Sequence, residues 1–414
     1  MSRSRIAVLG GGLGAIAAAW ELTQRPNWQN DYAIDVYQKG WRLGGKCASG
    51  RDAKNGQRIL EHGLHCFWGF YDNAFGMLRN GYDELARDSV PGFFPSVDDA
   101  FVRLDYVHFI ARWEGAWCRY AMHFPTSDEK PGTSPTPTSV AALGVRFVEQ
   151  LAAVLREHPD VAERFDATLG GRAGSAAERV ETLKAPLSRG PMLETFRAMG
   201  AHDEARDLLD KLTRAAPPPR LDAIAAAPEL KARVVDPAED YRRYVIHHAL
   251  SYAFFMLKGL FADGFPTTLD GFSRFDDEEI SAWLTRHGAT RDLLDSPIVR
   301  GFYNSSFCHP HGDFSVSDLA TGVSLRAILL MGFTYKGSFM WKMRAGMGDV
   351  VFAPMYELLR RRVVNFHFFH KVNALALDAS KRDVAAIHLE VQARTKDRAA
   401  YEPLIRVGDL LCWP

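Results

Sequence analysis

The feature that most constrains this chain is a short apolar run that ends in three consecutive glycines. Residues 6–9 are apolar throughout, as in a buried strand of a parallel sheet, and they lead directly into Gly10. A helix is predicted at residues 15–24, stopped by Pro26, and a second short strand at residues 33–37. A strand, turn, helix and strand of this size form a βαβ unit, which predicts an α/β fold.

The turn between the first strand and the helix reads Gly10-x-Gly12-x-x-Ala15. In this pattern the first glycine permits a tight turn, the second lets the backbone approach a pyrophosphate, and the small third residue lets the helix pack on the strand. The helix N-terminus offers N–H groups to the phosphates. We expect Gly10, Gly12, Leu13, Gly14 and Ala15 to bind a dinucleotide; a tight turn without a ligand is the alternative.

The end of the second strand should carry the residue that holds the ribose, which is usually acidic. The spacing places Gln38 there, followed by Lys39. An amide oxygen can accept a bond from one ribose hydroxyl, but it carries no charge. Asp35 is an alternative acceptor, although strand alternation points it elsewhere.

A second glycine motif favours FAD over NAD. It comprises Arg42, Gly44, Gly45 and Lys46, shortly after Gln38. A flexible glycine doublet flanked by cations can approach the pyrophosphate from the far side, and Arg42 can form charge-assisted hydrogen bonds to phosphate. An exposed basic turn is the alternative.

These motifs resemble the FAD-binding start of the amine oxidase and phytoene desaturase superfamily. Residues 61–73 (EHGLHCFWGFYDN) also resemble the E-x-G-L-H-x-F-x-G-x-Y-x-N stretch of plant-type phytoene and zeta-carotene desaturases. That stretch lies close to the flavin in such enzymes. The resemblance therefore implies that Gly63, Leu64 and His65 contact the cofactor.

A third stretch with the same resemblance comprises residues 346–348, a helix around 354–362 and a strand at 366–372. It implies that the backbone of Val372, at the end of that strand, binds the adenine. The resemblance covers residues 5–90 and 340–392. The family closes its FAD site with a further C-terminal motif, which residues 410–414 do not carry, so we interpret the chain as a fragment, with a divergent member as the alternative.

The predicted fold is a Rossmann-like, three-layer FAD-binding domain made from two chain segments, with an inserted mixed α+β substrate domain. The segments are residues 1–90 and 341–414, and the insert is residues 91–340. Strands are predicted within 102–122 and at 384–392. Helices are predicted after Ser139, at 241–262 and at 318–343. The aromatic helix at 249–261 could line a tunnel for a lipid-like substrate or lie on a membrane, and a plain buried core helix is the alternative.

Composition narrows the range of partners. The formal net charge is zero, so we expect no nucleic-acid partner. Five scattered cysteines without a C-x-x-C pair favour a reducing, cytoplasmic location, with contact to a membrane surface left open. His62 and His65 lack a matching carboxylate motif, so we expect no metal.

Together these patterns predict an FAD-dependent oxidoreductase that desaturates or oxidises an apolar, isoprenoid-like small molecule. Amine oxidation is a sister possibility within the same superfamily. A non-catalytic dinucleotide-binding protein and an NAD(P)-dependent dehydrogenase are the alternatives from other classes. The sequence identifies no catalytic residue, because the flavin would carry out the redox chemistry.

Overall fold

The computed structural model describes residues 3–113, 116–134, 139–170, 174–188, 201–215, 217, 237–396 and 400–414. The chain divides into two compact units. Unit 1 combines Met1–Leu104, Ser127–Pro135 and Lys336–Pro414, and unit 2 combines Asp105–Thr126 and Thr136–Tyr335. Unit 1 is therefore assembled from both ends of the chain.

A three-stranded parallel sheet organises unit 1. Its strand order is β1 (Ser4–Leu9), β2 (Tyr32–Tyr37) and β10 (Asn365–His367). Helix α1 (Leu13–Leu22) connects the first two strands, so the βαβ unit predicted from the sequence is present. Because β10 pairs with β2, the carboxyl end of the chain completes a sheet begun at the amino end.

The sheet buries only one of its faces well. Ile34 and Val36 of β2 are buried in a core shared with α1 and with α16 (Ala353–Arg361). On the other face, Arg5 and Leu9 of β1 are exposed in the part of the chain that the structure describes. The third layer expected from the sequence is therefore not formed over β1.

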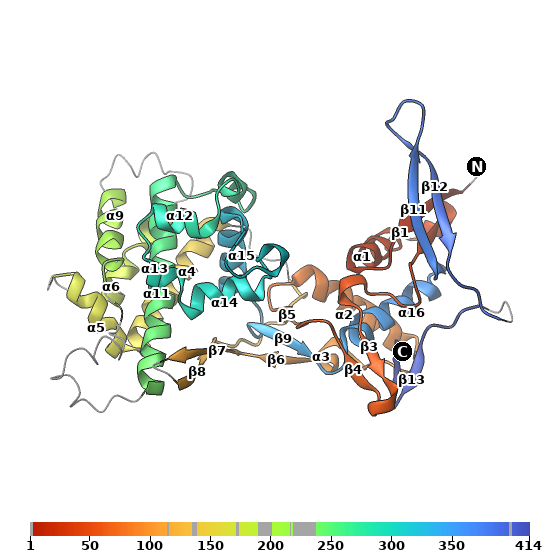
Figure 1. The fold of residues 1–414 in the computed structure, drawn as a ribbon, viewed down its shortest axis with the longest axis horizontal. Helices are drawn as coiled ribbons and strands as arrows, with labels where there is room; N and C mark the ends of the chain where they lie inside the picture. The colour runs from red at the N-terminus through yellow and green to blue at the C-terminus, as the bar shows by residue number, and fades with distance from the viewer. Residues whose placement is uncertain are drawn as a thin grey trace. The chain divides into compact units, whose positions relative to one another are not determined.

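The rest of unit 1 consists of a second sheet, three hairpins and short helices. The hairpin of β11 and β12 projects from the unit (Figure 1). The antiparallel sheet has the order β5–β9–β6, and the hairpins are β3–β4, β11–β12 and β13–β14. The bounds of these elements are η1 (Trp28–Asn30), η2 (Gly45–Cys47), β3 (Gly50–Asp52), η3 (Ala53–Asn55), β4 (Arg58–Leu60), β5 (Phe67–Trp68), α2 (Asp72–Arg87), α3 (Val97–Ala100), β6 (Phe101–Leu104), β9 (Met340–Met343), the π-helical turn η7 (Gly348–Phe352), β11 (His370–Leu377), β12 (Val384–Val391), β13 (Ile405–Val407) and β14 (Leu410–Cys412).

Unit 2 is mainly helical. In the described part of this unit, β7 (Tyr106–Trp113) and β8 (Ala116–His123) form an antiparallel ribbon. Helix α11 (Pro237–Asp263), the longest among the described residues, passes through the core. The other described elements are α4 (Val140–Glu157), α5 (Pro159–Thr168), α6 (Ala176–Glu181), α7 (Lys184–Ser188), α9 (Ala201–Leu212), η5 (Asp270–Phe275), α12 (Ile280–Arg286), α13 (Arg291–Leu294), α14 (Pro297–Ser305), η6 (Pro310–Gly312) and α15 (Thr321–Phe333).

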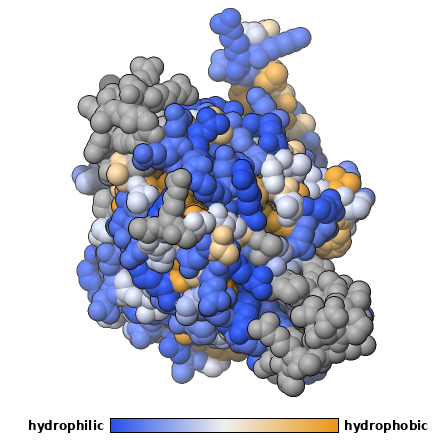
Figure 2. All heavy atoms as spheres, turned by 90° about the vertical axis from the view of Figure 1, so that its left-hand side faces the viewer, coloured by the Kyte–Doolittle hydropathy of each residue, from blue (hydrophilic) through white to orange (hydrophobic). Residues whose placement is uncertain are grey.

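Helix α11 is apolar and long enough to cross a membrane, but 83% of its apolar window is buried inside the protein. The face of unit 2 turned toward the viewer in Figure 2 is mostly hydrophilic. Both observations fit a buried core helix, which is one of the alternatives given above for this segment.

Two predicted elements end differently in the structure. The helix expected at 318–343 stops at Phe333, and the chain returns as strand β9. The single strand expected at 366–372 is divided into β10 and β11, because Phe369 adopts a positive φ of 62° between them. Val372 therefore lies inside β11, opposite Leu389 of β12, and not at the end of the sheet strand.

Candidate functional site

The two glycine motifs meet at the carboxyl end of the parallel sheet. The Gly44 amide donates a 2.8 Å hydrogen bond to the Gly11 carbonyl, and Gly12 and Gly44 form an isolated parallel bridge. Gly10 and Gly44 have φ values of +105° and +119°, where side chains are rarely tolerated. Two turns far apart in the sequence thus form one glycine-lined surface.

This surface has room for an anion. A Cβ atom on Gly12 would meet no atom closer than the Gly45 Cα at 4.0 Å, and one on Gly14 would meet nothing within 4 Å. Helix α1 begins beside Gly12 with no side-chain cap and no acidic residue in its first turn. Its first N–H groups and positive dipole end therefore suit a phosphate.

Gln38 and Asp35, the two candidates for the residue that binds the ribose, have different surroundings at the end of β2. The Gln38 side chain lies against the first glycine turn: its Oε1 is 2.7 Å from where a Gly11 Cβ would be. The Asp35 carboxylate is instead buried, with hydrogen bonds from Arg5 (2.9 Å) and His367 (2.8 Å). Burial alone would raise the pKa of Asp35, but the bonds from His367 and Arg5 lower it. Asp35 therefore already bonds to side chains of the neighbouring strands, whereas Gln38 lies at the glycine turn.

The cations in and near the second motif, Arg42, Lys46 and Lys39, differ in their contacts with the rest of the chain. The Arg42 guanidinium stacks on the Trp41 ring at 4.6 Å and donates through Nη1 to the Ser49 carbonyl at 2.5 Å. Part of its donor capacity is therefore already used. Lys39 and Lys46 are exposed and form no ion pair with any residue in the described part of the chain.

The segment 61–65 lies beside these turns and is anchored by Glu61. Glu61 Oε1 accepts hydrogen bonds from Ser49 Oγ and from the Met347 amide, each at 2.7 Å. Its Oε2 pairs with Nδ1 of His65. In the same segment, the Leu64 side chain is 84% exposed.

The return loop at 346–348 completes the same cluster. The Gly348 amide donates to Ser49 Oγ at 2.7 Å, so Ser49 links this loop to Glu61. Asp349 forms a buried ion pair with Arg51 at 2.5 Å. Burial raises the pKa of Asp349, although the Arg51 charge opposes that shift.

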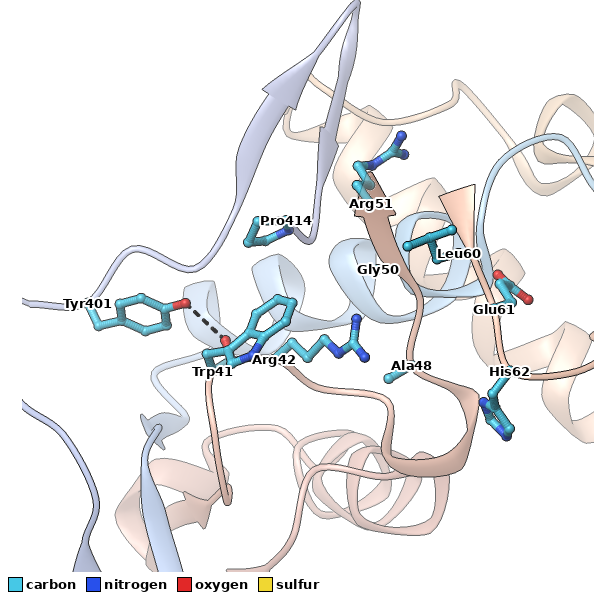
Figure 3. Close-up of a pocket in the computed structure, with 10 residues that line it drawn as sticks. All are labelled: Trp41, Arg42, Ala48, Gly50, Arg51, Leu60, Glu61, His62, Tyr401 and Pro414. Atoms are coloured by element: carbon cyan, nitrogen blue, oxygen red, sulfur yellow. Dashed lines mark hydrogen bonds between the residues drawn. The ribbon is translucent and has the colours of Figure 1, made fainter. Parts of the chain in front are cut away.

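A pocket of about 640 Å³ opens beside this cluster (Figure 3). Arg42 extends along Trp41 toward Gly50 and Ala48, and the Tyr401 hydroxyl donates to the Trp41 carbonyl at 3.1 Å. The walls are amphipathic, with three cationic or imidazole side chains, two aromatic rings and one carboxylate. The lining residues are Trp41, Arg42, Ala48, Gly50, Arg51, Leu60, Glu61, His62, Tyr401 and Pro414.

The structure thus brings most of the predicted site residues into one region of unit 1. Val372 lies apart from the Glu61 contacts, although its strand starts beside Gln38, whose carbonyl accepts from the His370 amide at 2.9 Å. Sequence reasoning missed Ser49, Glu61 and the Met347 amide as contacts. Only Glu61 carried a signal, because it opens the recognised stretch four residues before His65.

Comparisons with known proteins agree with this geometry over the N-terminal segment. A family model of the NAD(P)-binding Rossmann-like domain matches residues 8–80. Zeta-carotene desaturases of Solanum lycopersicum and Capsicum annuum are 32% and 35% identical to this chain over 75 residues. Those matches cover 18% of this chain and 12% of each relative.

A solved structure, an oxidoreductase from Methanosarcina mazei, aligns with 93% of this chain and 56% of its own. Its sequence identity is 8% and its TM-score is 0.38, too low to establish a shared fold. The comparisons therefore establish a dinucleotide-binding Rossmann-like domain at residues 8–80, with desaturase relatedness over that short stretch.

Proposed function

We propose that the N-terminal domain binds FAD and that the protein is a flavin-dependent oxidoreductase. The observation that carries this proposal is the hydrogen bond from the Gly44 amide to the Gly11 carbonyl, which joins the two glycine turns. A single glycine turn suits any dinucleotide. A second turn packed against it, with Arg42 and Lys46 beside it, supplies a second set of groups for the pyrophosphate.

In this proposal the pyrophosphate lies at Gly12 and the first turn of α1, and Gln38 accepts a bond from the ribose. The pocket beside Glu61 and His62 is large enough to hold part of a ring system. Bound flavin would supply hydride acceptance, while the chain binds and orients the reactants.

The substrate we propose is apolar and isoprenoid-like, oxidised or desaturated by hydride transfer. Two relatives are zeta-carotene desaturases by name, and the exposed Leu64 and the pocket residue Leu60 offer apolar surface near the proposed ring. Amine oxidation stays as the sister possibility, because the same cofactor arrangement serves both reactions.

Spectroscopy and ligand-induced stabilisation test the proposal. The purified chain is mixed with FAD, or separately with NADP⁺ and NAD⁺, and its melting temperature and flavin absorption are recorded after gel filtration. FAD should be retained and should raise the melting temperature, since a ligand that binds only the folded state stabilises it. Stabilisation by NAD(P) alone would instead support a dehydrogenase, and no response to any dinucleotide would overturn the proposal.

A further inference from the structure

We propose that Glu61 is a positioning residue that fixes His65 as the proton-exchanging group of the dinucleotide site. This inference rests on the proposed function above. It concerns a His–carboxylate pair in which the carboxylate is anchored to distant parts of the chain, while one imidazole nitrogen has no hydrogen-bond partner among the residues that the structure describes.

The Glu61 carboxylate is held from three directions. Ser49 Oγ and the Met347 amide donate to Oε1, and Nδ1 of His65 faces Oε2. The Ser49 hydroxyl is itself fixed, because it also accepts from the Gly348 amide. Because Oε1 already accepts from two donors, we assign Glu61 as the acceptor at Oε2 as well.

This arrangement determines the tautomer of His65. Because Glu61 is an acceptor, Nδ1 of His65 must carry the hydrogen, and in the neutral ring Nε2 is then the proton acceptor. No residue in the described part of the chain forms a hydrogen bond with Nε2 of His65. This nitrogen is also not fully buried. The side chain is 12% exposed, so a mostly buried imidazole presents one nitrogen to solvent.

The position of this nitrogen fits a role in oxidation. His65 follows the exposed Leu64 in the segment that we place beside the flavin, and its neighbour His62 lines the pocket. Forming a double bond by oxidation removes a hydride and a proton from two adjacent atoms of the substrate. A bound flavin would supply hydride acceptance, and Nε2 of His65 would accept the proton. Glu61 is the charged group that bonds to His65, and the Arg51–Asp349 ion pair belongs to the same cluster, since Asp349 accepts from the Gly346 amide next to Met347.

The first test measures the tautomer without any cofactor. Protein labelled with ¹⁵N-histidine is compared with the Glu61→Gln variant, and a His65→Gln variant assigns the signal. Wild-type His65 should show the Nδ1–H tautomer, and Glu61→Gln should lose that preference while the protein stays folded by circular dichroism. Glu390→Gln is the matched control, because this exposed carboxylate lies on β12 and contacts Lys371 and Asn373 instead. A wild-type Nε2–H tautomer would overturn the proposal.

The second test asks whether Nε2 faces the cofactor. Diethyl pyrocarbonate acylates uncharged imidazole nitrogens, and peptide mass spectrometry resolves His65 from exposed His388 in the same digest. With FAD at about 100 times its dissociation constant, roughly 1% of sites stay free, so acylation of His65 should slow by about tenfold or more. The rate at His388 should not change.

The outcomes separate the two proposals. If the wild-type chain binds FAD but His65 is not protected, His65 does not face the cofactor and this inference alone is overturned. If the chain binds no FAD at all, the proposed function fails, and the role of His65 that rests on it fails as well.

Discussion

Two carboxylates, one in each unit, accept hydrogen bonds from several donors but have different roles. In unit 2, Asp263 at the end of α11 accepts from Trp283 at 2.9 Å and from Arg286 at 2.8 Å, and it contacts His287 at 3.1 Å. All three donors come from α12 or the residue after it. In unit 1, Glu61 instead joins segments near residues 49, 65 and 347. The first cluster locks two neighbouring helices, whereas the second assembles a site from both ends of the chain.

The protonation of Asp263 agrees with a structural role. Burial alone would raise its pKa, but the hydrogen bonds from Arg286, Trp283 and His287 lower it to about 2. A lowered folded-state pKa adds stability above the unfolded value and loses it as the pH falls toward 2. The number of hydrogen-bond donors alone therefore does not identify a functional carboxylate. The segments that the donors connect distinguish Glu61 from Asp263.

The largest expected effect is on the structural cluster. Trp283 is fully buried and its Nε1 donates to Asp263, so Trp283→Ala should destabilise unit 2 by about 3–5 kcal/mol. Urea unfolding followed by circular dichroism measures the change, and FAD affinity should stay within about twofold because the variant is outside unit 1. Trp117→Ala is the control, since Trp117 is exposed and its loss should cost about 0.5 kcal/mol or less. Equal costs for both variants would contradict the comparison.

The next largest expected effect is a loss of FAD affinity without a loss of folding stability. Gly12 has φ of −79° and open space around its Cβ position, so Gly12→Val should fold normally. Its side chain would fill the place of the pyrophosphate and weaken FAD binding by about 100-fold, or about 2.7 kcal/mol. Fluorescence titration measures the affinity.

Gly44→Ala provides the contrast for Gly12→Val. A Cβ there would lie 2.6 Å from the Ala48 Cα at a φ of +119°, so stability should fall by about 1–3 kcal/mol. If Gly12→Val bound FAD as well as the wild type, the assignment of the first glycine turn would be wrong.

The third expected effect is a pH dependence of the folding stability of unit 2. Burial, with the charges of His248 and Arg164, lowers the pKa of His247 to about 3. The unfolded chain takes up a proton at His247 below about pH 6.5 while the folded chain does not, so stability should fall as the pH drops from 6.5 toward 3. His247→Gln should remove up to about 1.4 kcal/mol per pH unit from that slope. His108→Gln, at an exposed position, should leave the slope unchanged, and an unchanged slope in His247→Gln would refute the assignment.

Much of the first βαβ unit could be predicted from sequence because its signals are local. The strand, the glycine turn and α1 lie within a few residues of their predicted places, since apolar runs and glycines act on their own neighbourhood. The break between β10 and β11 could not be predicted, because Phe369 adopts a positive φ that no local residue preference indicates. The contacts of Ser49 and Met347 with Glu61 could not be predicted from the sequence either, because they join segments that only tertiary folding brings together.

The smallest expected effect concerns Leu64. The resemblance placed it against the flavin, and the structure leaves it 84% exposed in the absence of any covering chain segment among the described residues. Leu64→Ser should therefore change stability by less than about 0.5 kcal/mol, because little apolar surface is buried in the free protein. FAD binding should weaken a fewfold, about 0.5–1 kcal/mol, since the bound ring would cover part of this side chain. Leu375→Ser on the projecting β11 is the control, and equal affinities in the two variants would show that Leu64 faces solvent and not the cofactor.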